Sequence, residues 1–214
     1  MKRRDDLLKG PMEKAIEAIE KGEKKEEAIR RIKELYEDFH PLHDRYSEWC
    51  TSLLTFIGEH LGEEAVLKAT ERLMDEIYTE RFRQLKNLDY RSLVEAFVRM
   101  HRSHYSQFHV EEDEEKTIIT ITGCGCGGRM MKEGKYDNTN RHPVMWGTTK
   151  KAYPWSYHKK GMPYYCIHSY VMNDIFQKVG IPVETKYGFQ YDNGGNPIDD
   201  PCTYTIYIKR KGAQ

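Results

Sequence analysis

The segment Tyr164-Tyr165-Cys166-Ile167-His168 stands where a long aromatic stretch ends and a predicted helix begins. Two other short segments share its chemistry, Gly123-Cys124-Gly125-Cys126-Gly127-Gly128-Arg129 and Asp199-Asp200-Pro201-Cys202. Four of the five cysteines fall in these three segments, and each segment borders a predicted strand or helix. Thiols and an imidazole carried on turns can be aimed at one point, as a soft-ligand metal site requires. We therefore predict that the three segments converge on one metal-centred or thiol-centred site.

The composition limits the classes of function. The chain has 34 Lys and Arg against 34 Asp and Glu, and this balance argues against nucleic acid as a partner. No run of about 18 apolar residues is present, and the basic N-terminus lacks the apolar region of a signal peptide. We therefore expect a cytoplasmic protein that does not enter the membrane. An odd number of cysteines favours metal binding or catalysis over disulfides. The composition leaves open whether the protein forms a homodimer.

The pattern of apolar residues divides the 214-residue chain into a helical region, residues 1–110, and an α/β region, residues 111–214. Helical spacing predicts helices over 11–22, 24–39, 42–60, 63–85 and 90–108, the last with Asp89 as its N-cap. Pro41 is expected to end the second of them. Strand patterns cover 116–122, 183–191 and 202–209, with a helix over 167–179 and a turn over 193–197. The predicted fold class is α+β, an N-terminal helical bundle followed by a small antiparallel sheet with one packed helix and a long aromatic loop.

The glycine-rich segment supplies the candidates for thiol chemistry. Four glycines in six residues let the backbone take positive φ values and approach a ligand or another segment closely. The spacing is not that of a phosphate-binding loop. Cys124 or Cys126 is a candidate nucleophile, with His168 or His104 as its base, since a thiolate needs a neighbouring base or cation. Arg129 would clamp a carboxylate of the substrate, or serve as an ordinary surface arginine.

Three histidines share apolar faces of the predicted helices. His101 and His104 lie on one apolar face of the helix over 90–108, and His43, beside Asp44, lies on the apolar face of the helix over 42–60. A cluster of the three would bind a metal or relay protons. The alternative is that each histidine is hydrogen-bonded to a carbonyl group or faces solvent.

Residues 130–163 are irregular and rich in aromatic side chains. So long an irregular segment in a compact domain is typical of a lid or a binding loop. We predict that it covers a ligand pocket, and the alternative is that its aromatic rings fill the edge of the core. The predicted ligand-binding residues are Trp155, Tyr157, Tyr164 and Tyr165.

The order of elements resembles the vinyl-4-reductase-type small-molecule-binding fold. That fold is shared with TRAPP-type subunits and with proteins named for L-2-amino-thiazoline-4-carboxylate hydrolase. The resemblance lies in a cysteine that enters a helix, Cys166, then a two-stranded hairpin, then a cysteine that opens the terminal strand, Cys202. It implies zinc beside a closed pocket for a small hydrophobic ligand. The family's intervening glutamate and cysteine have no counterpart between Phe189 and Asp200, so Cys124 or Cys126 and His168 would have to replace them.

Two functions follow from these residues, with a third behind them. The first is a hydrolase that acts on a small cyclic amide or amidine. It would use zinc (iron is not excluded) held by Cys124, Cys166, Cys202 and His168, or a cysteine nucleophile without metal. The second is a small-molecule sensor or carrier with a structural zinc. The third is a purely structural partner subunit.

Overall fold

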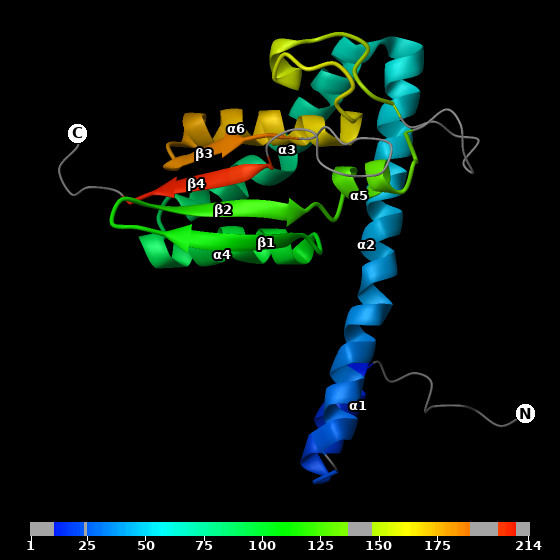
Figure 1. The fold of residues 1–214 in the computed structure, drawn as a ribbon, viewed down its shortest axis with the longest axis vertical. Helices are drawn as coiled ribbons and strands as arrows, with labels where there is room; N and C mark the ends of the chain where they lie inside the picture. Colours follow the sequence, from blue (N-terminus) through cyan, green and yellow to red (C-terminus); the bar gives the residue numbers. More distant parts are fainter. Residues whose placement is uncertain (1–10, 24, 137–146, 189–200, 209–214) are drawn as a thin grey trace, which may run out of the picture. The chain divides into compact units, whose positions relative to one another are not determined.

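The computed structural model describes residues 11–23, 25–136, 147–188 and 201–208 (Figure 1). Its residues form two compact units, Met1–Tyr46 and Ser47–Gln214. Among the described residues, no helix combines the length and the apolar character that crossing a bilayer requires. The turn predicted over 193–197 lies outside the described residues.

The first unit contains α1 (Pro11–Glu20) and the N-terminal part of α2 (Lys25–Leu61). The sequence prediction of two helices separated at Pro41 is wrong, because α2 is a single helix that contains this proline. Proline has no N–H group and so removes one hydrogen bond from a helix interior, but the rest of the helix can continue past it. Predicted and observed bounds of α1 agree closely.

The second unit adds α3 (Glu63–Leu85) and α4 (Tyr90–Ser103) to the C-terminal part of α2. Asp89 caps the N-terminus of α4, as predicted, and its carboxylate accepts a hydrogen bond of 2.9 Å from the amide of Ser92. The helix ends at Ser103, earlier than expected, because the next residues turn into the strand β1 (Gln107–Glu112).

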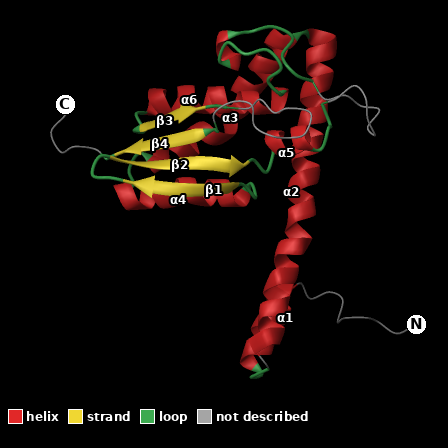
Figure 2. Ribbon diagram, in the orientation of Figure 1, coloured by secondary structure: helices red, strands yellow, loops and turns green. Residues whose placement is uncertain are grey.

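The sheet is antiparallel, with strand order β1-β2-β4-β3 (Figure 2). Its central strands are β2 (Lys116–Gly123) and β4 (Thr203–Tyr207), and β3 (Val183–Lys186) forms the second edge. Along β2 the side chains of Thr117, Ile119 and Ile121 are buried, whereas those between them are more exposed. This alternation places one face of the sheet against the helices, of which α4 contacts β1 and α6 (Ile167–Val179) contacts β3.

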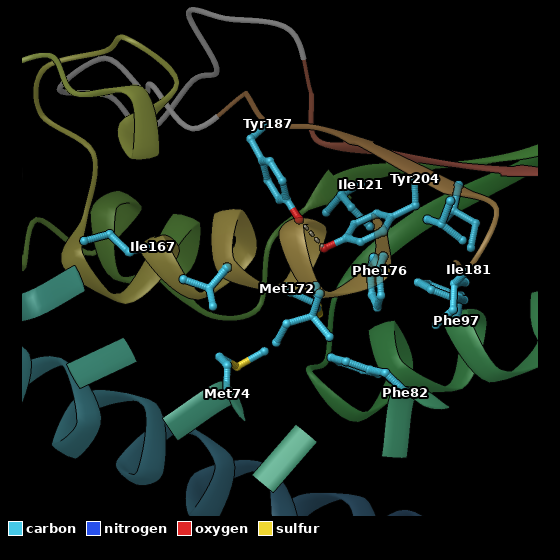
Figure 3. Packing of buried hydrophobic residues seen from close by; sticks show 14 of the residues in the cluster. Met74, Phe82, Phe97, Ile121, Ile167, Met172, Phe176, Ile181, Tyr187 and Tyr204 are labelled. Atoms are coloured by element: carbon cyan, nitrogen blue, oxygen red, sulfur yellow. Dashed lines mark hydrogen bonds between the residues drawn. The ribbon is translucent and has the colours of Figure 1, made fainter. Parts of the chain in front are cut away.

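The core joins this sheet face to three helices (Figure 3). Phe176 of α6 lies 4.8 Å from Phe82 of α3 and 5.3 Å from Phe97 of α4, between ring centroids. Phe97 in turn lies 6.1 Å from the ring of Tyr204 on β4. Because α3 and α4 share a core with the sheet, the compact units divide after Tyr46 rather than near residue 110, where the composition changes. The α+β class predicted from the sequence is confirmed.

Candidate functional site

The centre of the candidate site is the pair His104 and Cys126. His104 is the C-cap of α4, and Cys126 precedes the short helix α5 (Gly127–Lys132). The β1–β2 hairpin lies between them in the sequence, and the register pairs Gln107 with Gly123 at its open end. His104 lies three residues before this pair and Cys126 three residues after it, so the hairpin returns the chain to the same place. The distance from His104 Nδ1 to Cys126 Sγ is 3.0 Å.

Glycine makes this approach sterically feasible. A Cβ at Gly125 would lie 1.8 Å from the carbonyl oxygen of His104, and a Cβ at Gly127 would lie 2.4 Å from Sγ of Cys166. The predicted close approach of the glycine-rich segment to other segments is therefore confirmed. The predicted positive φ values are not found from Gly123 to Gly128, because close contact, and not a left-handed turn, is what excludes a side chain there.

The remaining cysteines lie around this pair. The pKa of Cys166 is raised well above its usual value, first by burial and then by the neighbouring thiols of Cys124, Cys202 and Cys126. Burial, with Cys124 nearby, raises the pKa of Cys202 to about 12, and its Sγ lies 2.8 Å from the carbonyl oxygen of Gly188. Cys124, Cys126, Cys166 and Cys202 therefore lie near one another, but the predicted ligand set of Cys124, Cys166, Cys202 and His168 is not a group whose ligand atoms all lie within 4.8 Å of one another. Cys166 and Cys202 are neutral thiols near pH 7, and no disulfide joins any of the five cysteines.

The pentapeptide at the start of α6 contributes Tyr165 rather than His168. The phenol of Tyr165 is hydrogen-bonded to Cys126, and its pKa is raised by burial and by that thiol. His168 Nδ1 is bonded to the carbonyl oxygen of Tyr165, and burial lowers the pKa of the imidazole. Cysteines are not among the groups that shift the pKa of His168. Because its pKa is lowered, the imidazole of His168 is neutral near pH 7, and the backbone carbonyl of Tyr165 holds it in place.

Arg129 lies beside the pair, in contact with carboxylates of the protein itself. Its guanidinium donates to Glu133 at 2.7 and 2.8 Å and to Glu48 of α2 at 3.4 Å, and its Nε donates to the carbonyl of Gly125 at 3.2 Å. Lys135 also bonds to Glu48. This network ties α5 and the glycine-rich segment to the part of α2 in the second unit. A substrate carboxylate would have to compete with both glutamates for Arg129.

Of the three predicted histidines, His101 and His104 have different surroundings. His101 is buried against Tyr204, with ring centroids 4.4 Å apart, and its Nε2 has no hydrogen-bond partner among the described residues. Burial lowers the pKa of His101 to about 4. His43 belongs to the first unit, where its Nδ1 lies 3.2 Å from a carboxylate oxygen of Asp44. The place of His43 in the predicted histidine cluster stays a prediction.

The predicted ligand-binding aromatic residues, apart from Tyr165, take part in packing and anchoring. Trp155 is buried and stacks on Tyr153 with ring centroids 4.3 Å apart. Tyr164 is buried, and its hydroxyl donates to Glu63 at the start of α3. Tyr157 has a left-handed backbone (φ 53°) and lies 5.0 Å from Tyr187. These contacts fix the described part of the aromatic segment to α3 and α6.

Two groups near the pair were not foreseen from the sequence. Tyr136 is half-buried, with its hydroxyl oxygen inside the protein near Cys166 and Cys124, and burial raises the pKa of its phenol well above the usual value. Glu48 binds Arg129 and Lys135 over a separation of more than eighty residues, for which the sequence holds no signal. Glu133 follows Arg129 by four residues, so its ion pair could have been read from helical spacing.

Comparison with known proteins identifies no relative of this chain. No family model matches the chain, no curated protein matches it, and no solved structure matches it. The resemblance drawn from Cys166 and Cys202 stays a prediction.

Proposed function

We propose that the protein is a cysteine-dependent hydrolase in which Cys126 is the nucleophile and His104 is its base. The observation that carries this proposal is the 3.0 Å separation of His104 Nδ1 and Cys126 Sγ. An imidazole in hydrogen-bond contact with a thiol is the arrangement that generates a thiolate at neutral pH. Cys166 and Cys202 lack this advantage because burial raises the pKa of each thiol.

The pair supports amide hydrolysis in two steps. In the first, His104 accepts the thiol proton while Cys126 Sγ attacks the carbonyl carbon, and the C–N bond breaks as the amine takes up that proton. In the second, His104 accepts a proton from water, the hydroxide adds to the thioester, and the carboxylic acid leaves while the proton returns to sulfur. Tyr165 keeps its proton at neutral pH because its pKa is raised, so its phenol can donate a hydrogen bond to the developing oxyanion.

The substrate class that we propose is a small cyclic amide or amidine. Cys126 is buried, which restricts the reaction to molecules small enough to enter beside it. The heterocycle itself comes from the resemblance to the thiazoline-carboxylate hydrolase group.

The experiment is a turnover assay on a panel of small cyclic amides that includes 2-amino-thiazoline-4-carboxylate. We expect Cys126→Ala to abolish turnover and His104→Ala to lower kcat by about 10²-fold or more, as loss of a general base does. The matched control, Cys202→Ala, should turn over at the wild-type rate. Turnover that survives in Cys126→Ala would contradict the proposal.

The clustered thiols favour a second candidate, a small-molecule sensor or carrier with a structural zinc. Cys124, Cys126, Cys166 and Cys202 lie near one another, and thiols with a nearby imidazole are a donor set that zinc prefers. No three of these Sγ atoms lie within 4.8 Å of one another, so they would have to move closer together to share one ion. Bound zinc would hold these segments in place. Metal binding would have to overcome the raised pKa of Cys166 and Cys202, because zinc takes thiolates.

Metal analysis separates the two candidates. A structural zinc predicts about one zinc ion per chain, loss of that ion in Cys166→Ala or Cys202→Ala, and a lower Tm after treatment with a chelator. The cysteine-dependent hydrolase predicts turnover that persists in metal-free protein. A metal-free protein with an unchanged Tm would remove the zinc candidate.

A further inference from the structure

The α1–α2 hairpin of the first unit buries its small residues and exposes its large ones. Ala15, Ala18 and Ala28 are buried. The exposed set comprises nine large apolar side chains: Met12, Ile16, Ile19, Ile29, Ile32, Tyr36, Phe39, Leu42 and Tyr46. Their exposed fractions range from 42% to 63%, so about half of each side chain contacts water. Large apolar residues of a single folded chain are normally distributed the other way.

The exposed residues of α1 and those at the start of α2 share one face of the hairpin. Ile16 and Ile19 each follow a buried alanine by one residue, and Ile29 follows Ala28 by one residue. One residue turns the side chain by about 100° around a helix axis. In a pair of antiparallel helices, side chains that lie about 100° further around each axis from the contact between the helices point to the same side of the pair. The two helices therefore present a continuous apolar face.

The other side of α2 is charged. Glu27, Arg30, Arg31 and Glu34 form a ladder of ion pairs at three- and four-residue spacing. Arg30 follows Ala28 by two residues, which places it about 200° away from the interior direction and off the apolar face. The hairpin is thus amphipathic in its described part, with one face suited to burial and one suited to water.

We propose that this apolar face is the interface with a second copy of the same chain, and that the two hairpins form an antiparallel four-helix bundle. Phe39, Leu42 and Tyr46 point within about 40° of the Ala28 direction and lie off this face. The other six side chains, each half exposed, offer on the order of 500 Å² per copy. Two such faces bury about 1,000 Å² in total, which is the area that a specific interface needs. Two identical faces related by a two-fold axis pair residue for residue, and a hairpin of two helices supplies half of a bundle.

The charge of the hairpin favours a protein partner over a lipid surface. Residues 11–46 contain eight Lys and Arg and ten Asp and Glu. Helices that lie on membranes are rich in Lys and Arg on the polar face, because the lipid surface is anionic. A slightly acidic hairpin lacks that attraction, whereas near-balance of charge does not oppose the approach of a second copy.

The test is the mass of the full-length protein in solution, measured by light scattering over a dilution series. We expect wild type at twice 25.3 kDa, and Ile19→Lys with Ile32→Lys at the monomer mass over the same concentrations. The control, Glu13→Lys with Glu37→Lys, places the same two lysines on the same helices outside the apolar face and should remain dimeric. Circular dichroism should show equal helix content in all three proteins.

Two results would overturn the proposal. One is a wild-type protein that stays monomeric over the whole series, which would mean that the face is covered by its own chain or by another partner. The other is a dimer that persists in the isoleucine double variant. Phosphatidylcholine and phosphatidylserine vesicles that co-sediment with monomeric wild type would identify a lipid surface as the occupant instead.

Discussion

His101 and His104 lie one helical turn apart on α4 and meet opposite surroundings. His101 packs on Tyr204 in the core, and His104 faces Cys126 at the end of the hairpin. Their spacing predicts a shared apolar face, and nothing in the sequence separates the two roles. The pairing of His104 with Cys126 depends on the register of the β1–β2 hairpin, which the sequence pattern of β1 does not reveal.

The first prediction concerns the pH dependence of stability through His101. Its pKa is about 4 in the fold and about 6.5 in the unfolded chain. Between pH 6.5 and pH 4, His101 binds a proton in the unfolded state but not in the folded state. The free energy of unfolding therefore falls by about 3 kcal/mol from this residue as the pH drops over this range. His101→Phe should lose less stability over this range in urea unfolding, whereas the exposed His109→Phe should behave as wild type. Equal losses in all three proteins would show that His101 is not held neutral.

The second prediction concerns the contact between Gly125 and His104. An alanine at position 125 would push its Cβ into the backbone carbonyl of His104, which no side-chain rotation can relieve. We expect Gly125→Ala to lower the free energy of unfolding by about 2 kcal/mol or more and to slow any reaction of Cys126. Gly123→Ala meets the flexible side chain of Gln107 and should cost less. Equal free energies of unfolding in the two variants would show that Gly125 does not lie against the carbonyl of His104.

At the scale of elements, strands with a buried face were predictable and an exposed edge strand was not. The residues Thr117-Ile118-Ile119-Thr120-Ile121-Thr122 alternate, because one face of β2 packs on the helices. β1 is largely exposed and carries acidic residues, so it has no such alternation, and the sequence pattern predicts the end of a helix over its first residues. The sequence predicts a break at Pro41 because proline lacks an N–H group. The hydrogen bonds on either side of Pro41 nevertheless hold α2 as one helix, and the sequence pattern does not reveal this.

The third prediction tests whether α3, α4, α6 and the sheet form one core. Phe176 is fully buried and touches aromatic rings from α3 and α4. Phe176→Ala should lower the free energy of unfolding by about 3–5 kcal/mol, the usual cost of removing a buried phenylalanine. Tyr207→Ala, on the more exposed side of β4, is the comparison and should cost clearly less. A small effect at Phe176 would separate α6 from that core.

At the scale of the whole molecule, the sequence predicts the α+β class, whereas the boundary between compact units after Tyr46 has no counterpart in the sequence pattern. Composition changes near residue 110, but Phe82 and Phe97 come from helices before that point and pack with Tyr204 from the last strand. Such long-range packing has no local signature. The roles of Cys126 as nucleophile and His104 as base are therefore the part of the account that most needs a direct measurement.

That measurement is the rate at which iodoacetamide alkylates each cysteine, followed by peptide mapping across a series of pH values. We expect Cys126 to be alkylated first near pH 7, and His104→Ala to slow this reaction about tenfold or more, because the Cys126 thiol then lacks the base that accepts its proton. Cys202, with a pKa of about 12, should stay unmodified until the pH is strongly alkaline. Alkylation of Cys126 that is no faster than that of Cys202, or that His104→Ala leaves unchanged, would contradict the account.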